Sequence, residues 1–387
     1  RYRERENHIS SDSWPIYISL QKDGILFKMR RTQDIPDKKS ATMFFQDCKL
    51  AHQAQITGIR HSIKEILPPD LLDLTQLQKE ANIRYGFTAS EVYDIAQSLY
   101  EKKLISYPRT SSRYLTEDVF DSLPPIMARL LSWELFPAAK GTASIDISSL
   151  FRHVINAEKA NVHHAIIITG IRPGNLPEKE MLVYRLVAGR MLEAFMPPCR
   201  IETTDIEAIC AAQHFKAEQT RIIEAGWHDV FMNSDIIPKS GYSVNELPEV
   251  EKGDTLNVCG RNLVHKKQLP VNPFTDAELV EYMELNGLGT VSSRTNIIRT
   301  LVNRKYIRYS GKYIVPTPKG MFTYETIRGK KIADTSLTAD WEKQLAGLES
   351  GMITRQDFLN RIRTLAKEMT DDIFNTYSQK EKVSILK

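Results

Sequence analysis

The stretch LISYPRTSS, residues Leu104–Ser112, places a tyrosine between a short apolar run and a proline. Because proline disfavours the α region for the residue before it, Tyr107 is expected to be extended, with its ring projecting from the backbone. Arg109 lies two positions further on and therefore on the same side of an extended strand, where its guanidinium could reach a phosphate that the tyrosine oxygen attacks. The stretch suggests a nucleophilic tyrosine with an arginine beside it.

Further hydrogen-bond donors follow Arg109 directly. They are Thr110, Ser111, Ser112 and Arg113, and we interpret them as additional phosphate-binding groups. A tyrosine beside a proline is also common as a packing residue, and R-T-S-S is an ordinary loop composition. The stretch alone therefore leaves a purely structural role open.

Local patterns predict a β segment followed by helices. Residues 16–29 alternate apolar and polar side chains around a turn at Lys22-Asp23-Gly24, which predicts a β-hairpin. One helix is expected around Leu74–Ala81. A second helix begins with a possible capping box of Thr88 and Glu91.

The remaining patterns predict an α+β, multidomain fold. Residues 117–195 are expected to be mostly helical, alternation from Ile201 to Val258 indicates β structure, and a short hairpin is predicted at Tyr306–Pro316. A helical insertion in a β domain is the simplest account. The expected domains are a β-rich arch of residues 1–66 and 198–272, a mainly helical domain of residues 67–197 with Tyr107, and a helical DNA-binding domain of residues 273–387 with a winged-helix-like segment.

The composition is that of a globular protein with about two or three domains. No apolar run among the 387 residues is long enough to span a membrane, so no membrane role is expected. The sequence starts at Arg1 without an initiator methionine, which we interpret as the cut end of a longer protein. The cysteines include no C-x-x-C pair, so we predict neither a zinc ribbon nor a disulfide framework but reduced thiols in the cytoplasm.

The net charge of +4 is too small to make the whole surface a polyanion binder, so nucleic-acid affinity must come from local clusters. One cluster lies between Val291 and Gly320, a stretch without any acidic residue. Its basic residues are Arg294, Arg299, Arg304, Lys305, Arg308, Lys312 and Lys319. Charge runs are often only solvated surface, but this one indicates a phosphate-binding surface.

The stretch Leu104–Ser112 closely resembles the active-site motif of type IA DNA topoisomerases, particularly the topoisomerase III branch. Segments elsewhere are similar to further motifs of that family, in the same order along the chain. They are Asp73–Ala81 and Ile95–Glu101 before the tyrosine, the histidine motif His163–Ile167, Gly287–Arg294 with Arg304–Ile307, and Asp340–Leu345 with Leu348–Gly351.

The resemblance implies that Tyr107 forms a link to a 5′ phosphate in single-stranded DNA, and that Arg109 and His163 stabilise the reacting phosphate. It also implies further DNA-binding residues in the C-terminal domain, namely Thr290, Ser292, Ser293, Arg294 and Arg299. Two positions depart from the pattern. Ser111 stands where the family commonly has an aspartate, and Ile168 stands where proline usually follows the double isoleucine.

The family's amino-terminal metal-binding domain, TOPRIM, supplies a glutamate and a D-x-D pair, and no D-x-D occurs in this sequence. The resemblance therefore implies Mg²⁺ in the full-length enzyme, bound by TOPRIM, with no metal site expected in this chain. It further implies a toroid, which we expect to be open here, and a chain that binds DNA without cleaving it alone. We also expect a monomer, a possible helicase partner and a cytoplasmic location at the bacterial nucleoid.

Two alternatives use the same residues differently. Residues 274–318 have the outline of a winged helix, so a sequence-specific DNA-binding protein would use Arg294 and Arg299 to read bases. A tyrosine recombinase is also a phosphotyrosine enzyme, but that class keeps its tyrosine near the C-terminus. Here Tyr107 comes early and His163 follows it.

Overall fold

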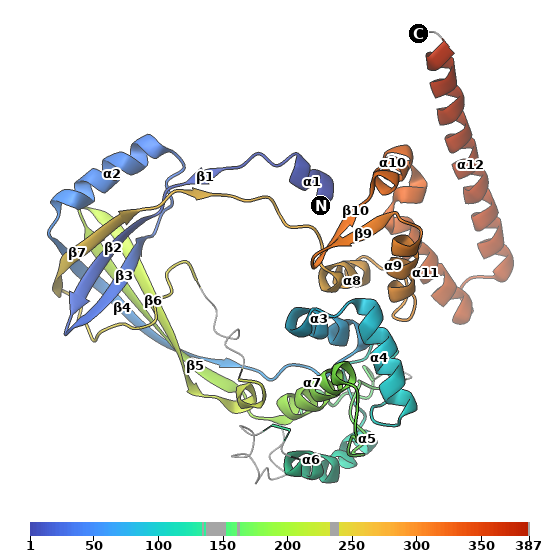
Figure 1. Ribbon diagram of the computed structural model, residues 1–387, viewed down its shortest axis with the longest axis horizontal. Helices are drawn as coiled ribbons and strands as arrows, with labels where there is room; N and C mark the ends of the chain where they lie inside the picture. The colour runs from blue at the N-terminus through green and yellow to red at the C-terminus, as the bar shows by residue number, and fades with distance from the viewer. Residues whose placement is uncertain (134, 137–151, 161–162, 233–239, 386–387) are drawn as a thin grey trace.

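The computed structural model describes residues 1–133, 135–136, 152–160, 163–232 and 240–385. In Figure 1 these residues form a β-barrel on the left and two helical bodies on the right, arranged around a ring. The predicted α+β class is confirmed.

Strands from residues 16–66 and 199–263 close into one barrel, with the neighbour order β2-β3-β6-β5-β4-β7. The strands are β2 (Ile16–Lys22), β3 (Ile25–Arg31), β4 (Gln53–Ile66), β5 (Cys199–Cys210), β6 (Gln213–Glu224) and β7 (Thr255–Leu263). Helix α2 (Lys38–Leu50) connects β3 to β4. The barrel therefore joins segments that lie before and after the tyrosine-bearing helices.

The predicted hairpin is present as β2 and β3. Its turn residues Asp23 and Gly24 have φ values of +50° and +82°, the left-handed pair that a two-residue type I′ turn requires. Ile16, Ile18 and Leu20 alternate along β2 and are fully buried in the barrel core. Strand alternation thus fixes which face of the hairpin points inward.

Strands β4, β5 and β6 extend beyond the barrel toward the lower helical body (Figure 1). Residues 60–65 of β4 are all exposed, although successive side chains point to opposite faces. This part of β4 is therefore open to solvent on both of its faces. Together with β5 and β6 it connects the barrel to the tyrosine-bearing domain.

The tyrosine-bearing domain contains α3 (Leu74–Tyr85), α4 (Ala89–Glu101), α5 (Glu117–Asp121), α6 (Leu123–Ser132) and α7 (Glu178–Phe195). The predicted capping box of α4 is present: Glu91 N–H donates to Thr88 Oγ1 at 3.2 Å, and Thr88 N–H donates to the Glu91 carboxylate at 2.9 Å. The sequence predicts residues 117–195 to be mostly helical with loops. In the described part of this range α5, α6 and α7 are helical, and 163–177 is an irregular loop because part of it pairs with the tyrosine segment. Residues 137–151 lie outside the described residues.

The C-terminal domain contains α8 (Asp276–Leu285), α9 (Arg294–Asn303), β9 (Ile307–Ser310), β10 (Tyr313–Pro316), α10 (Pro318–Ile327), α11 (Thr335–Glu349) and α12 (Arg355–Ile385). The predicted hairpin is present, and Gly311 at its turn has a φ of +59°. The succession α8, α9, hairpin is that of the predicted winged-helix-like segment.

Two extended connections join the barrel to the C-terminal domain. Strands β1 (Asp12–Ser13) and β8 (Lys266–Lys267) pair with each other between these bodies. Helix α1 (Tyr2–Glu6) precedes β1 and lies nearer the C-terminal domain (Figure 1). Arg1 forms an ion pair with Glu278 of that domain at 3.2 Å. The first residues therefore lie on the C-terminal domain, although the sequence assigned them to the β-rich domain.

The ring is closed by contacts of α3 with α8 and of α4 with α9. The prediction of an open toroid is therefore wrong: in the described residues the tyrosine-bearing domain rests directly on the C-terminal domain (Figure 1). Cys48, Cys199 and Cys210 are buried free thiols and Cys259 is exposed. None of the helices in the described ranges is both long and apolar enough to cross a bilayer.

Candidate active site

The tyrosine and histidine motifs run antiparallel and side by side. Ile105 and Ile168 form a bridge, and Ser106 N–H donates to the carbonyl of Ile167 at 2.8 Å. The Ser106 hydroxyl donates to the Ala165 carbonyl at 3.1 Å and accepts from Ile167 N–H at 3.0 Å. Because Ile105 and Ile168 are both buried, this pairing fixes the polar residues that follow at the domain surface.

Tyr107 lies between two other rings. The His163 ring centroid is 4.6 Å from that of Tyr107 with the planes inclined at 49°, and the Tyr100 ring makes an edge contact at 5.4 Å. His163 is exposed and Tyr107 is partly exposed, so both side chains are accessible to a ligand. The structure thus brings the predicted nucleophile and the predicted histidine together.

Arg109 faces α4. Its Nη2 donates to the Gln97 amide oxygen at 3.1 Å, and its guanidinium lies 5.2 Å from the centroid of the Tyr93 ring. Its Nε is buried without a hydrogen-bond partner in the described structure. The guanidinium is therefore oriented by α4, and because the side chain is partly exposed, its other N–H groups can bind an anion.

Sequence reasoning did not assign a role to the α4 residues that surround the motif. Tyr93, Gln97 and Tyr100 are spaced by four and three positions, so they share one face of the helix. That face lies over Tyr107 and Arg109. The helical spacing in the sequence was the signal that could have indicated these three residues.

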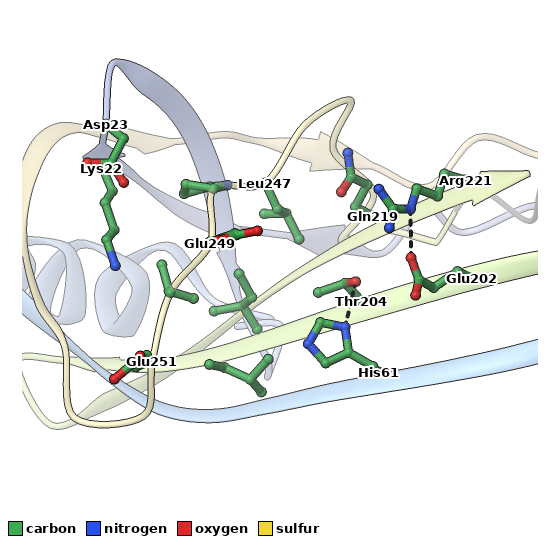
Figure 2. Close-up of a pocket in the computed structure, with 14 residues that line it drawn as sticks. Lys22, Asp23, His61, Glu202, Thr204, Gln219, Arg221, Leu247, Glu249 and Glu251 are labelled. Carbon is green, nitrogen blue, oxygen red and sulfur yellow. Dashed lines mark hydrogen bonds and ion pairs between the residues drawn. The ribbon is translucent and has the colours of Figure 1, made fainter. Parts of the chain in front are cut away.

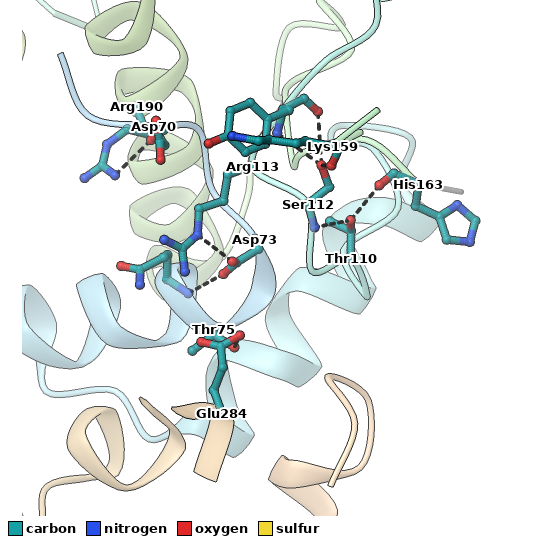
Figure 3. A network of polar contacts seen from close by, with 12 residues as sticks. Asp70, Asp73, Thr75, Thr110, Ser112, Arg113, Lys159, His163, Arg190 and Glu284 are labelled. Atoms are coloured by element: carbon teal, nitrogen blue, oxygen red, sulfur yellow. Dashed lines mark hydrogen bonds and ion pairs between the residues drawn. The ribbon is translucent and has the colours of Figure 1, made fainter. Parts of the chain in front are cut away.

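The two motif hydroxyls of Thr110 and Ser112 are turned into the domain. Thr110 Oγ1 donates to the His163 carbonyl at 2.7 Å, and Ser112 Oγ donates to the Lys159 carbonyl at 2.8 Å (Figure 3). Both residues are buried, whereas Ser111 between them is exposed. The structure gives Thr110 and Ser112 a positioning role, and of the three only Ser111 faces solvent for the predicted DNA contact.

Arg113 already has an ionic partner. Its Nε donates at 2.6 Å to Asp73, which is buried and also caps α3 by accepting from Gln76 N–H at 2.7 Å (Figure 3). Asp73 therefore ties the end of the tyrosine motif to the start of α3. A DNA contact of Arg113 remains a prediction that competes with this ion pair.

The predicted C-terminal residues divide into two groups. Thr290 and Ser292 are exposed just before α9, and Ser293 is partly exposed, with its hydroxyl accepting from Thr290 N–H at 2.8 Å. Arg294 is buried and contacts Glu284, while Arg299 donates to Asp94 at 2.8 Å. Arg294 and Arg299 therefore contact carboxylates of the protein, whereas Thr290 and Ser292 face solvent.

Five other cations of the same basic run are exposed. They are Arg304, Lys305, Arg308, Lys312 and Lys319, on the turn after α9, on the β9–β10 hairpin and at the start of α10. No ion pair involves them among the described residues. These five side chains carry the free positive charge that the sequence attributed to the whole run.

The described residues do not fit a Mg²⁺ site. Mg²⁺ requires oxygen ligands in an octahedral array, usually anchored by one or two carboxylates. No group of three or more His, Cys, Asp or Glu side chains in the described ranges is arranged to hold a metal ion. A reaction step through a metal therefore cannot be assigned to these residues.

Two cavities of the described structure lie away from Tyr107. One, of about 530 Å³, opens beside the barrel strands, where His61 Nδ1 lies 3.1 Å from Thr204 Oγ1 and Arg221 pairs with Glu202 at 2.6 Å (Figure 2). Another, of about 520 Å³, is apolar and lies between α1 and the C-terminal domain. Neither cavity is lined by Tyr107 or His163.

The sequence matches a known family over most of its length. Residues 1–360 match the family model described as DNA topoisomerase. DNA topoisomerase 3 of Bacillus licheniformis is 32% identical over 344 residues, covering 83% of this chain and 47% of the relative. DNA topoisomerase 3 of Bacillus subtilis is 30% identical over 349 residues, covering 84% of this chain and 48% of the relative. The chain spans about half the length of these curated relatives.

Among solved structures, the chain is similar to full-length topoisomerase I from Thermotoga maritima. The TM-score is 0.73 with 21% sequence identity, and the match covers 95% of this chain and 60% of that chain. At this identity the likeness shows a shared fold.

Proposed function

The chain belongs to the type IA DNA topoisomerases and is topoisomerase III-like, and from this premise we propose that Tyr107 is its strand-cleaving nucleophile. The enzyme would cut and reseal single-stranded DNA without ATP, and so relax or decatenate DNA. The observation that carries the proposal is the ring contact of Tyr107 with His163 at 4.6 Å, formed between two separate motifs.

In the proposed reaction, Tyr107 Oη attacks the phosphorus of a phosphodiester. A bond forms between Oη and the 5′ phosphate, the bond to the 3′ oxygen breaks, and the phenol proton leaves as the 3′ hydroxyl gains one. One ester replaces another, so the reverse attack by the 3′ hydroxyl reseals the strand without an external energy source.

Arg109 and His163 supply the charge stabilisation. Negative charge spreads over the phosphoryl oxygens in the transition state, and donors positioned in advance lower its energy. The partly exposed guanidinium of Arg109 and the exposed ring of His163 are the donors that we assign to this role. Gln97 and Tyr93 orient the Arg109 guanidinium before DNA arrives.

The single strand would be held by its backbone along the C-terminal domain. Thr290 and Ser292 are exposed there, and the unpaired cations Arg304 and Lys305 lie at the other end of α9. Contacts of this type go to phosphates and do not depend on the base sequence. Single-stranded DNA is therefore the proposed partner of this surface.

The test uses two proteins, residues 1–387 and the same residues fused behind a TOPRIM domain of the type IA family. Each is incubated with labelled single-stranded DNA, with and without Mg²⁺, and quenched with denaturant. We expect protein-linked DNA from the fusion with Mg²⁺ and none from residues 1–387, because the part of the chain that the structure describes does not fit the metal that the family uses.

The matched control is Tyr107→Phe in the fusion, which removes only the nucleophilic oxygen. It should abolish the adduct while leaving DNA binding within a few-fold. An adduct that persists in this variant would overturn the assignment of Tyr107. Sequence-dependent duplex binding without any covalent product would support the winged-helix alternative instead.

A further inference from the structure

Several aromatic rings lie at the candidate active site, and most of them already have a role. The Tyr107 ring carries the proposed nucleophile, and the exposed His163 ring is assigned to the reacting phosphate. The Tyr93 ring lies against the Arg109 guanidinium, which is 5.2 Å from its centroid. Tyr100, which also contacts Tyr107, is the ring that the proposed reaction does not use.

The Tyr100 side chain is accessible although its ring meets that of the nucleophile. The two ring centroids are 5.4 Å apart with the planes inclined at 76°, so the edge of one ring meets the face of the other. Tyr100 is 39% exposed. An edge contact covers only part of a ring, so an aromatic surface stays open beside the nucleophile.

The end of α4 holds Tyr100 in place. Leu99 beside it is fully buried in the core of the domain. Ser98 Oγ donates to the Glu180 carboxylate of α7 at 3.0 Å, and Lys102 pairs with the same carboxylate. Because the chain is held on both sides of Tyr100, a ligand that stacks on its ring loses little free energy to ordering of the protein.

The proposed phosphate site determines which ligand can reach this ring. Arg109 and His163 would hold a phosphate beside Tyr107, and each phosphate of a strand is linked through sugars to a base on either side. A base that flanks the held phosphate therefore comes within reach of Tyr100. Every base has a π-face that can stack on an aromatic side chain. In a duplex the neighbouring base pairs cover these faces, so only an unpaired strand offers one.

We propose that Tyr100 is a base-stacking residue, which binds a nucleobase next to the phosphate that Tyr107 attacks. The inference rests on the proposed function, because its ligand is the DNA strand at that site. It adds a contact with a base to a surface otherwise expected to bind phosphates. It also gives the site a preference for unpaired DNA that does not depend on the base sequence.

The experiment measures binding of two polymers to residues 1–387, so that no cleavage is needed. One polymer is a deoxythymidine oligonucleotide, and the other has the same length and phosphates but an abasic sugar at every position. Dissociation constants are measured by fluorescence anisotropy at several salt concentrations. Tyr100→Leu should weaken binding of the thymidine oligonucleotide about tenfold, as loss of one stacked base predicts, and leave binding of the abasic polymer unchanged. The salt slope should stay the same, because no phosphate contact is lost.

Two control variants make the test specific to the Tyr100 ring. Tyr100→Phe keeps the ring and removes only the hydroxyl, so it should bind both polymers as the unsubstituted chain does. Tyr282→Leu removes a tyrosine of similar exposure, 41%, from α8, where its ring lies 5.3 Å from that of Phe274. It should not change the ratio of the two dissociation constants. Thermal unfolding followed by circular dichroism shows that each variant is folded.

Three results would overturn the proposal. Equal weakening of both polymers by Tyr100→Leu would mean that the substitution disturbs phosphate contacts and not a base. Unchanged binding of both polymers would mean that Tyr100 only packs against Tyr107. An equal, base-dependent loss in Tyr282→Leu would mean that the effect is not specific to the active site. All three leave the assignment of Tyr107 to the adduct assay, so the two proposals can fail separately.

Discussion

Two clusters on the tyrosine-bearing domain differ in how fully their polar groups are used. Around Tyr107, the His163 ring is exposed and Arg109 keeps a donor without a partner. Around Asp73, by contrast, the charges are already engaged, with Arg113 at 2.6 Å and with the first turn of α3. Exposed side chains without an ionic partner are where a substrate phosphate can bind, whereas charges that are already paired hold the protein together.

This difference predicts that substitutions in the two clusters have opposite consequences. Changes around Tyr107 should reduce cleavage while the fold is kept. Changes around Asp73 should loosen the fold and affect the chemistry only through it.

The largest expected effect is on the reaction rate at the aromatic cluster. In the TOPRIM fusion, His163→Ala and Arg109→Ala should each slow DNA cleavage by roughly 10²–10³, the usual consequence of losing one charge-stabilising donor. The measurement is the rate of adduct formation under single-turnover conditions. His163 is exposed, so its substitution should change the free energy of unfolding by less than about 0.5 kcal/mol.

Near-normal cleavage in both variants would mean that the phosphate binds elsewhere. If either substitution lowered the free energy of unfolding by as much as it raised the activation free energy of cleavage, the two clusters would no longer differ. His164→Ala is the matched control, because its Nδ1 lies 2.7 Å from the neighbouring Ala165 carbonyl and it has no assigned role in the reaction.

A smaller effect, on stability, is expected at the ionic cluster. Asp73→Ala removes the cap of α3 and leaves Arg113 without this partner, which should destabilise α3 by about 2–3 kcal/mol. Hydrogen exchange of the α3 amides measures this loss. Asp121→Ala, an exposed carboxylate at the end of α5, should leave the same amides unchanged.

The smallest effect is expected at Ser111, the exposed position where the family commonly has an aspartate. Ser111→Asp should change the free energy of unfolding by no more than about 0.5 kcal/mol, because the side chain faces solvent. Cleavage by the fusion should stay within a few-fold, because the family commonly has an aspartate at this position. A gain or loss of tenfold would show that a carboxylate here acts on the reaction.

Local sequence patterns predicted much of the fold. Alternation defined the β2–β3 hairpin, the Asp23-Gly24 pair defined its turn, and Thr88 with Glu91 defined the start of α4. Each of these depends on residues a few positions apart. Strand alternation and helix capping depend only on such near neighbours, so the local sequence is sufficient to predict these elements.

The roles of the arginines depended on distant residues and could not be predicted. Arg294 lies in a run without acidic residues, yet its partners Glu284 and Thr75 lie outside that run. Closure of the ring likewise depends on α3 meeting α8, segments far apart in the sequence. A charge run shows which side chains are cations, but tertiary packing decides which of them remain free.

The most direct test of the account is to locate the DNA on the protein by peptide mass spectrometry of the trapped adduct. Trypsin separates the tyrosines of the site, because cleavage after Lys103 and Arg109 releases Leu104–Arg109 with Tyr107, whereas Tyr93 and Tyr100 lie on Tyr85–Lys102. The account predicts the nucleotide on Leu104–Arg109. A nucleotide on Tyr85–Lys102, where Tyr100 contacts Tyr107 at 5.4 Å, would contradict it.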